Sequence, residues 1–345
     1  MHDGWNRMRP VVAEDRPFHQ MALNETVHPP LPEVLEAVSR AGREAHRTHD
    51  ALGTALTRAL AEHLGVEPEH ILIGPGSGAL LQQLFTTRTG PDTHTVHAWS
   101  SWEAYPMMAA NAGSTTVRVP LTDCHHDLRA MAAAVTDRTR LVLLCNPNNP
   151  TGTALRHERV RAFLDELPGH VTVVVDEAYR DFADPGALAD GIGLYRGDER
   201  VCVVRTFSKS YGLLSLRVGY LVGHEPVLAP LRAQLPFFRV SHVAQQAAIA
   251  ALGAHEKVLQ GCAATARERD RLRRALLDQG WEVPVSQGNF LWLPMESGVE
   301  RFTQFCADHA VVVCGKPGEG VRVTVAEPEA NEAFRQLAAK YRESR

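Results

Sequence analysis

Two of the residues in this sequence with the greatest chemical potential each follow a short apolar run. Lys209 follows Arg200–Val204, and Asp176 follows Val171–Val175. Burial at the end of a strand can lower the pKa of a lysine, so that its neutral amine can form a Schiff base. A carboxylate in the same position needs a partner. From the residues alone, Lys209 could also be a surface lysine, and Asp176 could bind a metal, bind a cation or cap a turn.

Two further clusters consist of residues that form turns. Gly74–Gly78 (GPGSG) follows the run His70–Ile73 and opens an expected helix over Ala79–Phe85. Backbone N–H groups at a helix start, with glycines that allow close approach, suit a phosphate group. Asn146–Gly152 (NPNNPTG) follows the apolar run that ends at Cys145. Either cluster could equally be an ordinary structural turn.

The apolar runs that precede these clusters are continuous rather than alternating. Helical stretches such as His157–Leu167 separate most of them. This pattern predicts a parallel sheet that is covered on both faces. Such sheets bind ligands at the carboxyl ends of their strands, which is where the four clusters lie. The expected strands are Thr95–Trp99, Arg140–Leu144, Val171–Val175 and Arg200–Val204.

Other parts of the chain have different patterns. Leucines recur every four residues from Leu52 to Leu64 and predict an amphipathic helix that stops at Gly65. After about Pro230 the pattern becomes α+β, with expected helices Thr265–Leu277 and Glu329–Tyr341 and strands in NFLWLP and VRVTV. We therefore expect a large domain over residues 45–230. Residues 1–44 plus 231–345 would form a smaller domain.

Length and composition bound the function. The 345 residues suffice for about two domains. The net charge of −4 gives no reason to expect nucleic acid or an anionic membrane as a partner. No signal-peptide pattern or membrane span is present, and six scattered cysteines predict a reduced cytoplasmic protein. The histidine spacing predicts no metal site. Only four of the 36 basic residues are lysines, so Lys209 stands out.

Taken together, the spacings N-P-x-N-P-T-G, D-x-A-Y and S-K-x₇-R resemble fold-type I pyridoxal-phosphate-dependent aminotransferases. The sequence is most similar to the histidinol-phosphate aminotransferase subgroup. Within it, HAWSSWEAYP, RTFSKSYGLLSLRVGY and GEGVRVTVAEPEAN resemble the aromatic amino acid aminotransferases of actinobacteria. The resemblance covers about Leu23 to Leu337. It implies an α/β fold with a large doubly wound, mainly parallel sheet of the seven-stranded type and a smaller α+β domain. It also implies a homodimer.

The same resemblance implies the cofactor, pyridoxal 5′-phosphate, and a role for each residue around its ring. Lys209 would bind the cofactor covalently and move a proton between the substrate Cα and the cofactor. Asp176 would face the ring nitrogen and keep it protonated. Asn149 and Tyr179 would hydrogen-bond the ring oxygen, and Tyr179 counts with Lys209 and Asp176 as catalytic. Trp102 would stack on the ring, although it could instead be a core residue.

Further residues would hold the cofactor phosphate and the substrate. The phosphate would lie on the backbone of Gly76–Gly78, with the side chains of Thr206, Ser208 and Arg217 around it. Arg322 would bind the substrate α-carboxylate with its planar fork, unless it is a surface arginine on a strand. Asn149 would also touch the substrate. Asn289 would line the pocket or, equally, form a turn at the entry to a strand.

Several positions depart from the subgroup. Thr48 stands where a tyrosine often reaches the cofactor phosphate of the neighbouring subunit, and Ala79 stands in a stretch that is often acidic. Cys314–Lys316 replaces the usual R-P-F, while Arg239 and His242 replace small polar residues. These changes lie around the expected pocket. They predict a specialised substrate rather than that of the housekeeping relatives.

The function implied by the resemblance is transamination between an amino acid and a 2-oxo acid such as 2-oxoglutarate. The amino donor would be an aromatic or related amino acid, or histidinol phosphate. The alternative is another pyridoxal-phosphate-dependent transformation on the same fold, such as decarboxylation, cyclisation or oxidation, in a specialised biosynthetic pathway. A regulatory module without catalysis would normally add a DNA-binding domain, for which the chain has no room.

Overall fold

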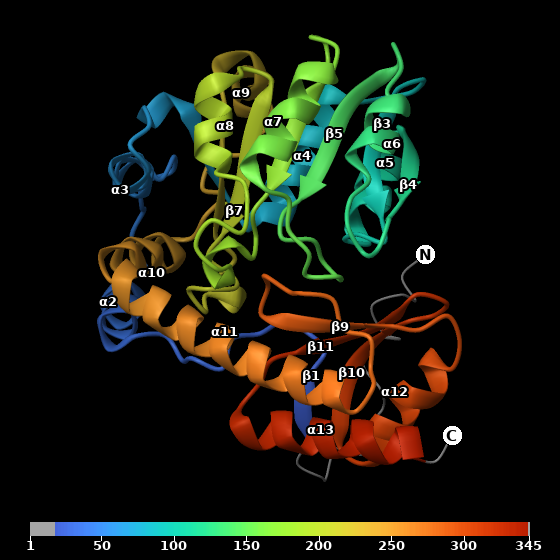
Figure 1. Ribbon diagram of the computed structural model, residues 1–345. Helices are drawn as coiled ribbons and strands as arrows, with labels where there is room; N and C mark the ends of the chain where they lie inside the picture. Colours follow the sequence, from blue (N-terminus) through green and yellow to red (C-terminus); the bar gives the residue numbers. More distant parts are fainter. Residues whose placement is uncertain (1–17, 344–345) are drawn as a thin grey trace.

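The computed structural model describes residues 18–343, and these residues form two β-sheets. Part of the predicted small domain, residues 1–17 and 344–345, therefore lies outside the described residues. Figure 1 shows the smaller, four-stranded sheet below the larger, seven-stranded sheet, on the side where the parallel strands of the larger sheet end. No helix within residues 18–343 is long and apolar enough to cross a membrane.

The large sheet confirms the expected mainly parallel architecture. Six of its seven strands run parallel to one another, and only β8 runs antiparallel to its two neighbours. The expected strands agree with the observed ones to within two residues at each end. Across the sheet, the strands are β2 (Ile71–Gly74), β8 (Gly219–Val222), β7 (Val201–Thr206), β6 (Thr172–Asp176), β5 (Thr139–Cys145), β3 (His94–Trp99) and β4 (Thr115–Pro120).

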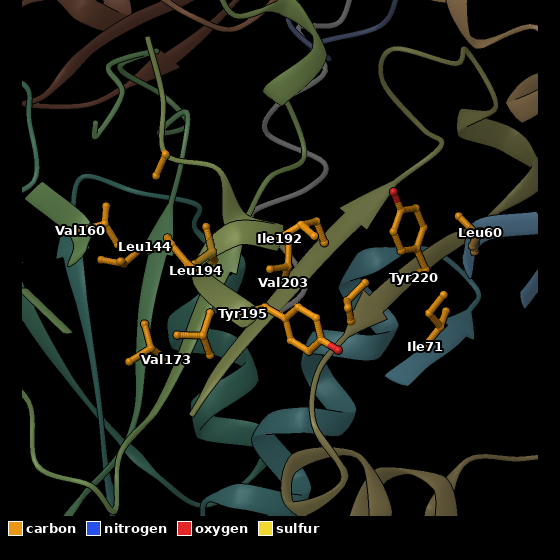
Figure 2. Close-up of a cluster of buried hydrophobic side chains, with 14 of the residues drawn as sticks. Leu60, Ile71, Leu144, Val160, Val173, Ile192, Leu194, Tyr195, Val203 and Tyr220 are labelled. Carbon is orange, nitrogen blue, oxygen red and sulfur yellow. The ribbon is translucent and has the colours of Figure 1, made fainter. Parts of the chain in front are cut away.

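Helices cover both faces of this sheet, as in a doubly wound fold. On β6, Val173 and Val175 join one apolar cluster, while Val174 joins another on the opposite face. Figure 2 shows part of the first cluster, with Val173 and Val203 near Leu194 and Tyr195. The first face packs α3 (Thr54–Leu64), α6 (Leu128–Ala133), α7 (His157–Glu166), α8 (Gly191–Gly197) and α10 (His242–Gly253). The second packs α4 (Ser77–Arg88), α5 (Ala104–Asn111) and α9 (Glu225–Gln234).

The small sheet joins the beginning of the described chain to its last third. Its order is β1 (His19–Met21), β10 (Val311–Lys316), β11 (Gly320–Thr324) and β9 (Phe290–Pro294), and β1 pairs parallel to β10. One face packs against α11 (His255–Asp278), α12 (Val299–Asp308) and α13 (Pro328–Glu343). Because alternate residues point to opposite faces, Arg322 and its neighbour Trp292 lie on the other face.

The predicted boundary between the domains stays a proposal. Pro230 lies inside α9, and Leu231 of the same helix packs in the core of the large sheet. Helix α10 also contributes to that sheet's other core, and it packs against α2 (Pro32–Arg43). These contacts favour a boundary beyond the two helices, and we propose that position rather than residue 230.

Two expected helices differ from the observed ones. Helix α3 begins only at Thr54, because Gly53 before it has a left-handed backbone conformation, with φ of 70°. Leu52 was expected in this helix but lies before it and is 52% exposed. Helix α11 begins at His255, ten residues before the predicted start at Thr265. The described part of the chain also contains three short 3₁₀ helices: Pro68–His70, Arg180–Phe182 and Leu214–Leu216.

A buried ion pair fixes the ends of the two central strands. Arg205 on β7 donates from Nε to Oε2 of Glu177, which follows β6, over 2.7 Å. The Glu177 side chain is fully buried, and its Oε1 accepts from the backbone N–H of Gly191 at the start of α8. The pair therefore ties β6, β7 and α8 together next to Asp176 and Thr206.

We predict that Arg205→Ala destabilises the protein by about 3–5 kcal/mol, because it leaves the Glu177 carboxylate buried without its main partner. Urea denaturation would measure the loss in the free energy of unfolding. The double variant Arg205→Met, Glu177→Met serves as the control. It should lose less, because it leaves no buried carboxylate without its main partner, and Arg180, which also lies 3.4 Å from Glu177, keeps its contact with Asp181. Unfolding of Arg205→Ala at the wild-type urea concentration would contradict this account of the pair.

Candidate active site

The predicted site residues gather at the carboxyl edge of the large sheet. They come from the loops that follow β2, β3, β5, β6 and β7. Strand β8 is antiparallel, so its first residue, Gly219, lies beside Thr206 at the end of β7. That pairing brings Arg217 to the same edge. The small sheet adds Arg322 from β11.

The loop between β2 and α4 forms a close-packed cradle. A Cβ atom on Gly76 would lie 2.4 Å from the Arg217 guanidinium, and one on Gly219 would lie 2.6 Å from the backbone nitrogen of Ser77. No side chain caps the first turn of α4, which therefore presents backbone N–H groups. Arg217 also approaches Ser208, with Nη1 3.4 Å from Oγ. N–H groups, hydroxyls and a guanidinium in one place suit a phosphate.

Trp102 borders the same cradle. A Cβ atom on Gly78 would lie 3.3 Å from Cη2 of the Trp102 ring. The indole is half-buried and packs edge-on against Tyr105, with ring centroids 5.5 Å apart. A flat ring held beside the phosphate cradle could stack on an aromatic ligand.

Asp176 is a buried carboxylate at the end of β6. Its Oδ2 accepts from the Tyr105 hydroxyl over 2.8 Å, and its Oδ1 accepts from the backbone N–H of Ala178 over 3.2 Å. Burial raises the pKa of this carboxyl to about 6, and the hydrogen bond from Tyr105 counteracts part of the rise. A cationic partner, such as a protonated ring nitrogen, would restore the ionised form.

Tyr179 and Asn149 lie near Asp176 but have different partners. The Tyr179 hydroxyl accepts from Nδ2 of Asn24 over 2.9 Å, and Asn24 also accepts from Thr324. Asn149 accepts from Arg322 through Oδ1, over 2.6 Å. Both residues are buried. They place one hydroxyl and one amide at the junction of the two sheets.

Lys209 has an amine suited to nucleophilic attack. Its Nζ donates to the carbonyls of Leu23 and Asn24, over 3.2 and 3.1 Å. Burial, helped by the nearby charges of Arg322 and Arg217, lowers its pKa to about 7. Much of the amine is therefore neutral, and so reactive, near neutral pH.

Arg322 brings a buried positive charge to the junction. Besides Asn149, it donates through Nη2 to the carbonyl of Ala22 over 2.5 Å. Its Nε is buried and has no hydrogen-bond partner in the described structure. A carboxylate would provide acceptors for such a guanidinium.

The remaining predicted residues vary in their surroundings. Asn289 is buried and donates to the carbonyl of Glu25, while its Oδ1 has no partner in the described structure. Thr48 is exposed, and Arg239 donates to the carbonyl of Ile73 in β2. His242 lies 3.3 Å from Glu44. No hydrogen bond or ion pair joins Thr48, Arg239 or His242 to Lys209 within residues 18–343, and the sequence assigns these three residues no role in the site.

Sequence reasoning missed three residues of this site. Tyr105 holds Asp176, Asn24 holds Tyr179, and Asn148 accepts from Ser101, which joins the loops after β3 and β5. Two of them had a local signal, because Tyr105 follows Trp102 by three residues across the start of a helix and Asn148 lies within the cluster Asn146–Gly152. The other contacts join segments that are far apart in the sequence.

The chemistry of the gathered groups fits pyridoxal phosphate. The cradle suits its phosphate, Asp176 suits its ring nitrogen, and the Lys209 amine suits its aldehyde. The Arg322 guanidinium, with its unpaired Nε, suits the carboxylate of an amino acid. The individual roles remain predictions.

Comparisons with known proteins agree with this fit. A family model described as aminotransferase class I and II matches residues 19–338. The chain is 45% identical to an aromatic amino acid aminotransferase of Thermobifida fusca, over 96% of this chain and 93% of that protein. It is 44% identical to one of Streptomyces coelicolor, over 97% and 93%. Among solved structures, it is similar to histidinol-phosphate aminotransferase from Sinorhizobium meliloti in complex with pyridoxal-5′-phosphate. That match has a TM-score of 0.89 and 29% identity, over 95% of this chain and 92% of that one.

We predict that Tyr105→Phe raises the pKa of Asp176, because it removes the hydrogen bond that favours the ionised carboxylate. If Asp176 must be ionised for activity, the acid limb of kcat/KM moves to higher pH. The loss of a hydrogen bond to a charged group should also lower kcat about tenfold or more. A pH–rate profile measures both effects.

Tyr195→Phe is the matched control. The Tyr195 hydroxyl contacts His70, at a distance from Asp176, and its loss should leave the acid limb in place. An unchanged acid limb in Tyr105→Phe would mean that Tyr105 does not tune Asp176.

Proposed function

The chain belongs to the class I and II aminotransferases, and we propose that it moves the amino group of an aromatic or related amino acid to a 2-oxo acid such as 2-oxoglutarate. The observation that carries the proposal is the placement of the Lys209 amine, with its pKa of about 7, at one sheet edge with Asp176 and Arg322. The names of the relatives support an aromatic donor, and the name of the similar solved structure keeps histidinol phosphate as a candidate.

The cofactor of this aminotransferase is pyridoxal 5′-phosphate. When bound, it supplies an aldehyde and an electron-withdrawing ring that stabilises negative charge at the substrate Cα. The backbone of Gly76–Gly78, with Thr206, Ser208 and Arg217, would hold the phosphate. The Asp176 carboxylate would hold a proton on the ring nitrogen, and Tyr105 would keep that carboxylate ionised. Asn149 and Tyr179 would donate to the ring oxygen.

Arg322 and Lys209 divide the work on the substrate. The Arg322 guanidinium would bind the α-carboxylate, and Asn149, already bonded to it, would fix its orientation. That orientation would turn the Cα–H bond toward the Lys209 amine, which would take the proton and deliver it to the cofactor side. Holding the carboxylate in this way favours proton transfer over the loss of carbon dioxide.

We predict that the purified holoenzyme converts to the amino form of its cofactor when mixed with phenylalanine, tyrosine or tryptophan. The measurement is the absorbance of the bound cofactor, followed for each amino acid and for histidinol phosphate separately. Addition of 2-oxoglutarate should reverse the change, because the second half of the reaction consumes the amino form. Lys209→Arg should slow the conversion about 10²–10⁴-fold, since it removes the proton-transfer group.

Lys340→Arg, on the exposed face of α13, is the matched control and should behave as wild type. Carbon dioxide release without formation of the amino form would instead support a decarboxylase on this fold. A response limited to histidinol phosphate would replace the aromatic donor.

We also propose a cytoplasmic homodimer. The six cysteines form no disulfide, as expected in a reducing compartment. Two neighbouring loops carry exposed apolar side chains, with Leu52 at 52%, Phe237 at 72% and Phe238 at 50% exposure. The Phe238 N–H donates to the carbonyl of Ala51, which holds these loops together. A second copy of the chain would cover this apolar surface.

We predict that sedimentation analysis finds a dimer, and that the double variant Phe237→Ser, Phe238→Ser shifts it toward the monomer, because burial of these rings would favour association. Val285→Ser removes another exposed apolar side chain, with 55% exposure, from a different surface and is the control. A wild-type monomer at micromolar concentration would reject the proposed dimer.

A further inference from the structure

The hairpin of β10 and β11 carries two cations on one face. Cys314 pairs with Arg322 and Lys316 pairs with Gly320, so all four residues lie on the same side of the sheet. The opposite side is apolar: Val313, Val321 and their alternate neighbours pack in the core of the small sheet. Arg322 and Lys316 therefore both lie on the face that meets the large sheet.

Lys316 meets the large sheet beside the ring-stacking candidate. Its Nζ donates to Oε2 of Glu103 over 3.0 Å and lies 3.5 Å from the carbonyl of Ser101. Glu103 directly follows Trp102 in the chain. The Lys316 side chain is only 11% exposed, whereas that of Glu103 is 31% exposed. The lysine is thus held in place, and its carboxylate partner lies closer to solvent.

The two cations share one face of the hairpin and suit a ligand with two carboxylates. Lys316 is two residues along β10 from Cys314, the direct partner of Arg322, and the backbones of such diagonal neighbours lie about 7–8 Å apart. Both charges act on the same carboxylate, that of Glu103. Burial raises the pKa of Glu103, but Lys316 and Arg322 outweigh it and hold that pKa below its usual value. Without a substrate, Lys316 and Glu103 therefore form an ion pair. Their opposite charges cancel, so the pair adds no net charge beside Arg322.

We propose that Lys316 is the residue that recognises the second carboxylate of a dicarboxylic substrate, and that Glu103 occupies it when the substrate lacks this group. This inference rests on the proposed transamination. With an aromatic substrate, the Lys316–Glu103 pair stays closed. With 2-oxoglutarate on Arg322, the distal carboxylate takes the place of Glu103, whose side chain moves toward solvent. The buried ammonium keeps an anionic partner in both cases, which avoids the penalty of an unpaired buried charge.

The pair could instead only fasten the hairpin to the large sheet. Glu319, at the turn of the same hairpin, also accepts from Nε1 of Trp99 over 3.1 Å and contacts Ser100. A purely structural pair would affect every substrate alike when broken. A recognition residue would affect only substrates with a second carboxylate, so the substrate dependence separates the two roles.

The test is the reaction of the amino form of the holoenzyme with 2-oxoglutarate and, separately, with phenylpyruvate. Lys316→Met should raise KM for 2-oxoglutarate about 10–100-fold, as expected for the loss of a hydrogen bond to a charged group. It should leave KM and kcat for phenylpyruvate within about twofold. Lys316→Arg should retain most of the affinity for 2-oxoglutarate. Glu103→Gln should lower KM for 2-oxoglutarate, because it weakens the competing partner.

Lys257→Met is the matched control, because Lys257 also pairs with a glutamate, Glu33, over 2.6 Å, but has an exposed side chain. Equal effects of Lys316→Met on both oxo acids would overturn the proposal and leave a structural pair. A wild-type enzyme that transaminates but rejects dicarboxylic oxo acids would also overturn it. Failure of every amino acid and oxo acid with the wild-type enzyme would instead reject the proposed function itself.

Discussion

The hydrogen bond between Arg322 and Asn149 joins the two sheets at the site, and the rest of the arrangement depends on it. A buried guanidinium is stable only when its donors meet acceptors. Asn149 supplies one acceptor from the large sheet, and the carbonyl of Ala22 supplies another from the N-terminal segment. That segment is held in turn by the pairing of β1 with β10. One buried charge thus sets the relative positions of three parts of the chain.

Lys209 is also buried, but its surroundings favour the neutral amine rather than the charged form. Its amine donates to the neutral carbonyls of Leu23 and Asn24, and burial together with the nearby arginines disfavours its protonated form. The same N-terminal segment therefore supplies carbonyl acceptors to Arg322 and to Lys209. Arg322 stays charged because a guanidinium does not deprotonate in proteins, whereas an ammonium loses its proton readily when buried. This difference allows one residue to bind an anion and the other to act as a base within the same site.

Local patterns were sufficient to predict most of the fold and the main polar groups. Continuous apolar runs predicted β5, β6 and β7, and the clusters that follow them contain Asn149, Asp176 and Lys209. The contacts that tune these groups were not predictable in the same way. The hydrogen bond from Asn24 to Tyr179 and the pair of Lys316 with Glu103 join residues more than 150 positions apart. The prediction that Leu52 lies in a helix was also wrong. The spacing of leucines carries no information on the backbone of Gly53, whose left-handed conformation places the helix start at Thr54.

Asp176 shows why the protein fold and its cofactor have to be considered together. Burial raises the pKa of this carboxyl from 3.8 to about 6, so between those values the folded chain holds a proton that the unfolded chain has released. Stability therefore falls as pH rises through that window, and at neutral pH the buried carboxylate opposes folding. A protonated ring nitrogen beside Asp176 would reverse this effect, because an opposite charge favours the ionised carboxylate. The carboxylate that weakens the protein alone is therefore the group that would hold the protonated ring nitrogen of the cofactor.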